Sequence, residues 1–179
     1  MDYVVLDLEW NQASDSRDAR NRLLTFEIIE IGAVKLNSRM EIVDTFEELI
    51  RPQVYDTMHH ITEKLIGIHM KDLSGCRTFD VVMKDFLAWC GEDFMFGTWG
   101  PQDLTELQKN MRFFGMEPLG KGPVRFYDIQ KLFSIAYEDQ KVRRSLEYAV
   151  DYLQIPKDIP FHRAISDAVY TLSLIHISE

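Results

Sequence analysis

Residues 3–10 read YVVLDLEW, an apolar run that is interrupted only by Asp7 and Glu9. Short runs rich in β-branched residues are typical of buried strands, so we expect a central strand over Tyr3–Glu9. Side chains two positions apart leave the same face of a strand, and Asp7 and Glu9 therefore project together. They repel each other and lose hydration unless something neutralises them, and a divalent metal ion is the usual partner. Alone, such a pair would more often be a solvated face of an edge strand, but the apolar flanks argue against that interpretation.

Working outward, two further strand-like runs follow at 27–36 (EIIEIGAVKL) and 40–50 (MEIVDTFEELI), joined by a short polar turn. The chain therefore opens as a three-stranded meander. After Pro52 the apolar spacing becomes helical, and later strands are interleaved with helices. This order predicts an α/β fold with a mixed five-stranded sheet flanked by helices. The remaining strands are expected at 93–99 and 124–127, and helices near 61–68, 79–87, 104–114, 128–138, 145–153 and 163–172.

The composition indicates one compact domain, because 179 residues with 46% hydrophobic and 27% charged residues can bury a substantial core. No apolar run approaches the roughly 18 residues of a membrane span, and the acidic N-terminus does not resemble a secretory signal. We therefore expect a cytoplasmic protein without a membrane partner. Cys76 and Cys90 lack the spacing of a zinc site or the density of a disulfide scaffold.

The net charge of −9 argues against a protein that coats nucleic acid through general electrostatics. It does not exclude a nuclease, since bound divalent cations can themselves supply the positive charge that phosphate needs.

Three further polar residues stand at places where chemistry is possible. Asp103 follows the expected strand 93–99 near the start of a helix, where an acidic residue also simply favours the helix dipole. The segment FHRAISDA contributes His162 and Asp167. Five residues of a regular helix rotate by roughly 140°, so these two could not meet if both lay well inside one. Pro160 favours a position for His162 at the junction before the helix, although a lone histidine here would more often be structural.

Together these residues resemble the DEDDh exonucleases, a family that includes ribonuclease T, the proofreading exonuclease subunits and the Eri-type RNA-trimming enzymes. The first motif matches DLEW, with Asp7 and Glu9, and the second matches Asp103. The third, H-x-A-x-x-D, matches His162, Ala164 and Asp167. The resemblance covers nearly the whole chain.

Details of the sequence narrow the resemblance. A sister pattern has tyrosine four residues before the last aspartate, where this chain has Arg163, so the histidine variant matches better. The stretches EIIEIGAV at 27–34 and LIGI at 65–68 also look like this family, although Ile66 and His69 replace two threonines that are usual in the second region. The Trp-Gly pair just before Asp103 looks closest to the Eri-type subgroup, which favours RNA over DNA.

The resemblance implies a ribonuclease H-like sheet and a metal-dependent 3′-to-5′ exonuclease that releases nucleoside 5′-monophosphates from single-stranded RNA or DNA 3′ ends. It implies two Mg²⁺ or Mn²⁺ ions, with His162 as the general base that deprotonates the attacking water. The implied metal ligands are Asp7, Glu9, Asp103 and Asp167. The implied substrate-binding residues are Leu8, Trp10, Asn11, Leu65 and Ile68.

Two other functions remain alternatives: a proofreading exonuclease that acts on DNA, and a catalytically silent interaction module on the same fold. The complete set of four acids and a histidine argues against the silent module. Two basic clusters either guide a nucleic-acid strand or serve solubility. They comprise Lys141, Arg143 and Arg144, and Arg17, Arg20 and Arg22.

The last eight residues, 172–179 (LSLIHISE), resemble a translated sequencing-library adapter. We therefore expect a single exonuclease domain over residues 1–171, a native continuation that differs after Thr171, and no function for His176.

Overall fold

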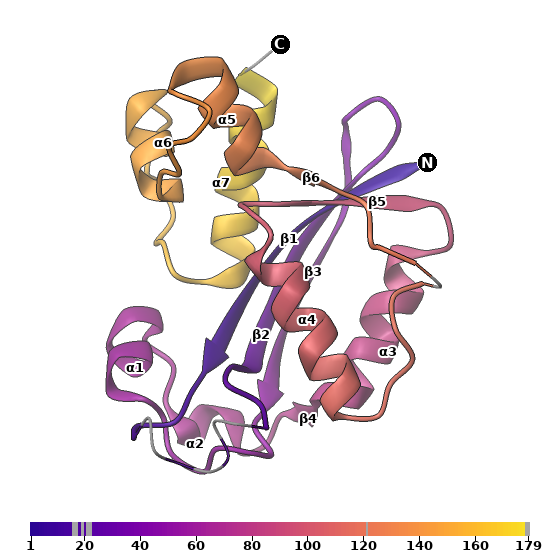
Figure 1. Cartoon of the computed structure of the whole chain (residues 1–179), viewed down its shortest axis with the longest axis vertical. Helices are drawn as coiled ribbons and strands as arrows, with labels where there is room; N and C mark the ends of the chain where they lie inside the picture. Colours follow the sequence, from indigo (N-terminus) through magenta and orange to yellow (C-terminus); the bar gives the residue numbers. More distant parts are fainter. Residues whose placement is uncertain (16–17, 19, 21–22, 121, 178–179) are drawn as a thin grey trace.

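The computed structural model describes residues 1–15, 18, 20, 23–120 and 122–177. Within this part of the chain, six strands form one mixed sheet in the order β4-β3-β2-β1-β5-β6 (Figure 1). The predicted α/β architecture and its opening meander are confirmed. The sixth strand is β4, which is only two residues long and therefore carries no periodic pattern that a sequence could reveal. The strands are β1 (Asp2–Asn11), β2 (Glu27–Leu36), β3 (Ile42–Arg51), β4 (Arg77–Thr78), β5 (Phe94–Thr98) and β6 (Phe126–Asp128).

The first half of strand β1 has a partner strand on each side, whereas its second half, within the described part of the chain, has a partner on one side only. It pairs antiparallel with β2 from Tyr3 to Asn11, with a bulge between Glu9 and Trp10. On its other side it pairs in parallel with β5 only from Asp2 to Val5. Beyond Val5 this edge of β1 has no partner strand among the described residues, so its backbone groups are free to bond side chains from elsewhere.

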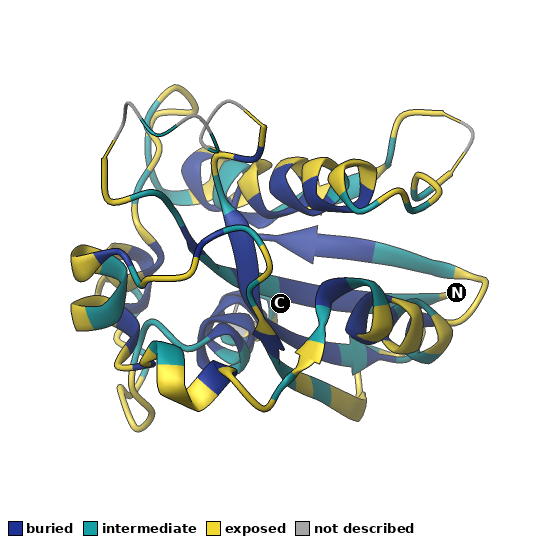
Figure 2. Cartoon of the chain, turned by 90° about the horizontal axis from the view of Figure 1, so that it is seen from below, coloured by how far each residue is buried: buried dark blue, intermediate teal, exposed yellow. Residues whose placement is uncertain are grey.

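Helices pack on both faces of the sheet, and Figure 2 shows the strands largely buried between them. Alternate β1 side chains face opposite layers. Val4, Leu6 and Leu8 belong to the core cluster shared with α3 and α4, whereas Val5 packs with Ala168 of α7. Asp7 and Glu9 therefore lie on the α7 face. The helices are α1 (His60–Ile66), α2 (Met70–Leu73), α3 (Phe79–Cys90), α4 (Gln102–Phe113), α5 (Ile129–Tyr137), α6 (Leu146–Tyr152) and α7 (Ala164–Ile177).

Helix α7 continues into the adapter-like residues as far as Ile177, with Leu172 and Leu174 2% and 3% exposed. None of the helices in the described part of the chain is long and apolar enough to cross a membrane.

Gly32 allows α7 to approach the sheet beside Asp7. It lies directly opposite Asp7 in the β1–β2 register. A Cβ atom at this position would lie 2.0 Å from the backbone nitrogen of Ile165 and 2.1 Å from the carbonyl carbon of Ala164. The absence of a side chain at Gly32 thus brings the first turn of α7 against the strand pair.

Replacing Gly32 with alanine should be strongly destabilising, because the added methyl group meets backbone atoms that cannot rotate away. We expect a loss of about 3 kcal/mol or more in the free energy of unfolding, at or above the upper end of ordinary overpacking. Urea denaturation of Gly32→Ala measures it. Gly75→Ala is the matched control, since a Cβ atom there meets nothing within 4 Å. Equal stability of both variants would contradict the close approach of α7.

Candidate active site

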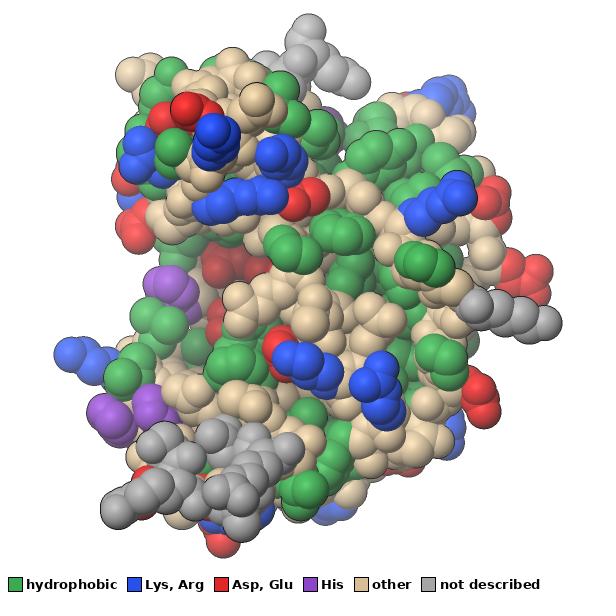
Figure 3. Space-filling model, in the orientation of Figure 1, with side chains coloured by type: hydrophobic (Ala, Val, Ile, Leu, Met, Phe, Trp, Pro, Cys, Tyr) green, Lys and Arg blue, Asp and Glu red, His purple; other side chains and the backbone are tan. Residues whose placement is uncertain are grey.

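Four carboxylates from three elements converge at the open end of β1. Asp7 and Glu9 project from β1 toward α7, and Asp167 lies in the first turn of α7. Asp103 lies in the first turn of α4 and is only 6% exposed. Its Oδ1 accepts a hydrogen bond of 3.2 Å from the backbone nitrogen of Leu8, one of the groups released where β5 leaves β1. Figure 3 shows a hollow with acidic side chains on its floor and histidine side chains near its rim.

His162 lies beside this cluster in the segment just before α7. The helix begins at Ala164, so the predicted junction position of His162 agrees with the structure. Its φ angle of 63° is in the left-handed region, and its backbone nitrogen lies 3.3 Å from each carboxylate oxygen of Asp167. Glu9, His162 and Asp167 each offer a ligand atom, and these atoms all lie within 4.8 Å of one another. The four acids and the histidine of the sequence motifs are thereby brought together.

The four acids are close together and largely buried, and both effects raise their pKa values. Burial, followed by repulsion from Asp167 and Glu30, raises the pKa of Glu9 to about 8. Burial raises the pKa of Asp103 to about 7, even though hydrogen bonds from its own and the Leu8 backbone nitrogens oppose the shift. Burial together with the neighbouring acids Asp103 and Asp167 raises the pKa of Asp7 well above its ordinary range.

The pKa of Asp167 is raised less than those of Asp103 and Glu9, to about 6, because the backbone hydrogen bond from His162 opposes the effect of burial. Arg163 lowers the pKa of Glu9, but this attraction is smaller than the effects of burial and of the other acids. The four carboxylates offer oxygen atoms, which hard divalent cations such as Mg²⁺ and Mn²⁺ prefer as ligands. A bound cation would also relieve their mutual repulsion. The chemistry of the donor set therefore fits a divalent metal centre.

The stability of the metal-free protein should fall as pH rises through the folded-state pKa values. These values lie above the ordinary ones, so the folded state retains protons that the unfolded state has lost. The stabilisation is fully present below about pH 4, where carboxyl groups ordinarily titrate, and is lost progressively up to about pH 8. Thermal melting in chelator from pH 5.5 to 8.5 measures this slope. A variant with Asp7, Asp103 and Asp167 changed to Asn and Glu9 changed to Gln should show a flatter profile. Identical slopes would mean that the site acids are not strained.

The predicted substrate residues fall into three structural situations. The side chains of Leu8 and Ile68 are 3% and 5% exposed and pack in hydrophobic clusters. Trp10 is half-buried, with its ring centroid 5.5 Å from that of Phe26. Leu65 of α1 is 50% exposed.

Asn11, the fifth predicted substrate residue, is fully buried. Its Nδ2 donates to the Thr57 carbonyl at 2.9 Å, and its Oδ1 accepts from the His59 backbone nitrogen at 2.9 Å. His59 immediately precedes α1, so Asn11 ties that helix to the end of β1.

Three of the four described members of the two basic clusters are paired with acids. Arg143 contacts Asp128 at 3.1 Å, and Arg144 contacts Glu138 at 3.0 Å. Arg20 lies 2.8 Å from Asp18. Arg17 and Arg22, which form a cluster with Arg20, lie outside the described residues.

Glu30 and Arg163, to which the sequence motifs assign no role, form an ion pair beside the site. Glu30 is fully buried and its Oε1 lies 2.7 Å from a terminal nitrogen of Arg163. A glutamate within the apolar stretch EIIEIGAV was the sequence signal for a buried, paired charge.

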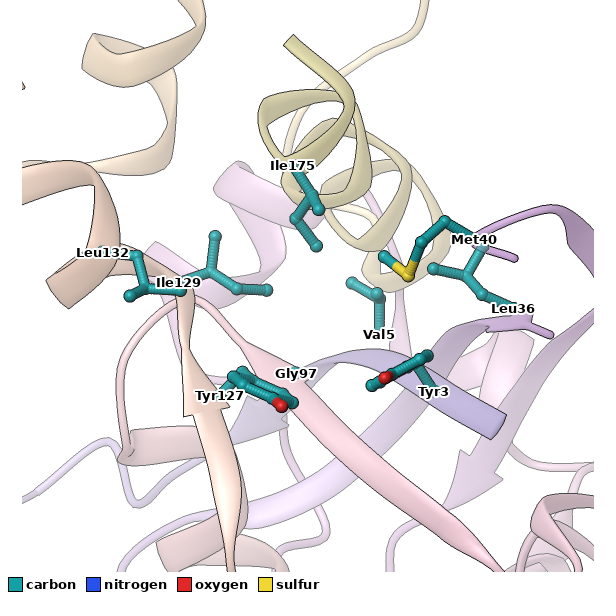
Figure 4. Close-up of a pocket in the computed structure, with 9 residues that line it drawn as sticks. All are labelled: Tyr3, Val5, Leu36, Met40, Gly97, Tyr127, Ile129, Leu132 and Ile175. Carbon is teal, nitrogen blue, oxygen red and sulfur yellow. The ribbon is translucent and has the colours of Figure 1, made fainter. Parts of the chain in front are cut away.

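An apolar pocket of about 280 Å³ lies at the opposite end of β1 from the acids (Figure 4). Its lining contains no acidic residue and no histidine, so it does not contribute to the carboxylate site. The lining residues are Tyr3, Val5, Leu36, Met40, Gly97, Tyr127, Ile129, Leu132 and Ile175.

Comparison with known proteins defines the class to which this fold and site belong. The exonuclease family model, which is named for ribonuclease T, matches residues 4–175. The chain therefore belongs to the exonuclease family, as the resemblance of its motifs indicated.

Two curated relatives extend the comparison. The chain is 26% identical over 173 residues to the PolC-type DNA polymerase III of Caldanaerobacter subterraneus subsp. tengcongensis, covering 97% of this chain and 11% of that protein. It is 24% identical over 153 residues to the human 3′-5′ exoribonuclease 1, covering 79% of this chain and 43% of that protein. The chain thus spans less than half the length of either relative.

Solved structures share the fold. The nuclease domain of 3′hExo, described as a DEDDh family member bound to rAMP, superposes with a TM-score of 0.78 at 20% identity, covering 99% of this chain and 92% of that one. The Mg²⁺- and Mn²⁺-bound form of S. pombe Pop2p gives a TM-score of 0.69 at 19% identity, covering 97% and 81%.

Proposed function

We propose that this chain is a metal-dependent 3′-to-5′ exonuclease that releases nucleoside 5′-monophosphates from single-stranded 3′ ends, with RNA preferred over DNA. The observation that carries the proposal is the convergence of four carboxylates and one imidazole at the open end of β1. A binding module has no need for four acids whose mutual repulsion and burial raise their pKa values.

Asp7, Glu9, Asp103 and Asp167 would hold two divalent ions, Mg²⁺ or Mn²⁺. When bound, such ions supply positive charge to the scissile phosphate and lower the pKa of a water molecule. Asp7 would be a central ligand of this set, because the charges of Asp103, Asp167 and Glu9 all act on it. Asp103 is held in a fixed orientation by the Leu8 backbone.

His162 would accept the proton of the attacking water. Neutral imidazole is the side chain best matched to this task near neutral pH. The bond from its backbone nitrogen to Asp167 keeps the residue beside the acids while leaving its ring nitrogens free for water. His162 and Asp167, one of the four proposed metal ligands, are therefore positioned by the same helix start.

The terminal nucleotide would rest between the end of β1 and α1. Leu65 offers an exposed apolar surface there, and Trp10 a half-buried ring suited to stacking on a base. Asn11 would contribute indirectly by anchoring the segment that leads into α1. The side chains of Leu8 and Ile68 would support this wall from beneath.

RNA is the favoured substrate because the chain resembles a 3′-5′ exoribonuclease, and its fold matches a nuclease domain solved with rAMP. A DNA proofreading exonuclease is the second candidate. It is supported by the match of 97% of this chain to part of a DNA polymerase III.

One digestion experiment tests both candidates together with the catalytically silent module. Matched 5′-labelled RNA and DNA oligonucleotides are incubated with the protein, with and without Mg²⁺, beside Asp7→Ala. Shortening from the 3′ end, dependent on metal and faster for RNA, is the expected result. Faster DNA digestion would favour the proofreading candidate, and no metal-dependent turnover of either would favour the silent module.

Added Mg²⁺ or Mn²⁺ should raise the melting temperature of the protein, because an ion that binds only the folded site stabilises it by RT ln(1 + [L]/Kd). At 100 times Kd this amounts to about 2.7 kcal/mol for one site. The variant neutralised at all four acids should lose this response. Differential scanning fluorimetry across a metal titration provides the measurement, and equal shifts in both proteins would place the metal elsewhere.

A further inference from the structure

A buried ion pair joins the segment that carries His162 to the sheet. Glu30 is fully buried on β2, directly opposite Glu9 of β1. Its Oε1 accepts hydrogen bonds from Nε and a terminal nitrogen of Arg163, at 2.9 and 2.7 Å. Its Oε2 accepts a bond of 3.3 Å from the backbone nitrogen of Ala164, the first residue of α7. Both oxygens of Glu30 are thus engaged by residues 163 and 164.

Arg163 is held by two strands. Besides Glu30 on β2, its terminal nitrogen lies 3.3 Å from Oε1 of Glu47 on β3. A guanidinium group presents its donors in a rigid planar fork, so contacts to two strands restrict its orientation more than a single point charge would. The side chain of Arg163 therefore links the segment before α7 to the sheet in a fixed orientation.

His162 lies between two residues that are both held by contacts, Arg163 and Phe161. On its N-terminal side, the ring of Phe161 stacks on Tyr170 of α7, with centroids 4.4 Å apart. His162 itself has a φ angle of 63°, a conformation that non-glycine residues adopt rarely and that persists only when the surroundings hold it. The contacts of its two neighbours supply that restraint.

The position of α7 itself does not depend on the ion pair alone. Gly32 admits the helix backbone to the sheet, and Ala168 and Leu172 pack against Val5 and Val34. The specific effect of Arg163 should therefore fall on the peptide immediately before it, which sets the direction of the His162 side chain.

We propose that Glu30 and Arg163 are positioning residues whose ion pair fixes the direction in which His162 presents its imidazole to Glu9 and Asp167. The inference rests on the proposed function for the role of His162 as general base. Neither residue touches the substrate, and neither supplies a proton.

A kinetic cycle separates this role from general structural support. At saturating metal, Arg163→Gln should lower the single-turnover rate roughly 10- to 100-fold, the usual scale for residues that orient a functional group, with KM unchanged. Saturation is required because Arg163 also lowers the pKa of Glu9. Arg163→Lys keeps the charge opposite Glu30 and should lose less, so it serves if Arg163→Gln does not fold. In a His162→Ala background, neither change should have a further effect. An equal loss in both backgrounds would overturn the proposal.

A second measurement reports the position of the ring without any turnover. The protein is labelled with ring-¹³C histidine, and the His162 signal among the five histidines is identified as the one missing from His162→Ala. Bound Mn²⁺ should broaden this signal strongly in the parent and less in Arg163→Gln, when both proteins are saturated with Mn²⁺ as judged by calorimetry. Unchanged broadening would overturn the proposal.

Arg77→Gln is the matched control. Arg77 forms ion pairs with Glu48 on β3, next to Glu47, and with Asp85 of α3, and neither partner belongs to the segment that carries His162. It should leave both the rate and the broadening unchanged, and an effect equal to that of Arg163→Gln would overturn the proposal. If the parent degraded no oligonucleotide, the proposed function would fail, whereas the Mn²⁺ experiment would still decide whether the ion pair positions His162.

Discussion

Asp7→Asn should nearly abolish nuclease activity while the protein remains folded. The substitution keeps the shape of the side chain but removes the charge on which Asp103, Asp167 and Glu9 all act. We expect a loss of at least about 10³-fold in turnover, the upper range for removal of one electrostatic group from an active site. Single-turnover digestion of a labelled RNA oligonucleotide measures it.

Stability provides the control for Asp7→Asn. Since burial and repulsion from neighbouring acids destabilise the Asp7 carboxylate, its neutralisation should raise the melting temperature of the metal-free protein. Asp93→Asn is a matched substitution at an exposed position, where the carboxylate pairs with the amino terminus of the chain at 3.0 Å. It should change neither property. A folded Asp7→Asn protein with parental activity would refute the metal-site assignment.

His162→Ala should lower turnover by roughly 10²- to 10⁴-fold, the usual scale for general base catalysis, while metal affinity changes little. The backbone N–H of His162 donates a hydrogen bond to the Asp167 carboxylate. This bond survives the substitution because alanine has the same backbone N–H. Single-turnover assays at saturating metal measure the chemical step without interference from product release. Calorimetric titration with Mn²⁺ checks the second part of the expectation.

The pH profile distinguishes a base from a ligand. Activity of the parent should fall at acidic pH because a protonated imidazole cannot act as a base, and His162→Ala should lack this limb. Saturating metal is essential, because protonation of Glu9, with its raised pKa of about 8, would otherwise produce an acid limb of its own. A variant that lost metal binding in proportion to activity would assign His162 to the metal instead.

Much of the fold was predictable because its signals are local. The apolar run around Asp7 and Glu9 predicts a buried strand, and the spacing of two predicts that both acids share a face, since this follows from strand geometry alone. Pro160 indicates that His162 precedes the last helix, which begins at Ala164. The elements that escaped prediction, β4 and α2, span two and four residues, too few for a periodic pattern.

Local sequence patterns establish which side chains are available: two acids on one strand face, an aspartate at each of two helix starts, and a histidine before the last helix. That these side chains meet follows from the packing of distant segments. Asp103 reaches the cluster because β5 leaves β1 after Val5 and frees the Leu8 backbone nitrogen. Gly32 lets α7 bring Asp167 onto the sheet, and the Glu30–Arg163 pair spans 133 positions of the chain. Such contacts are invisible to local periodicity, because they depend on how the sheet brings distant segments together and on the burial that follows.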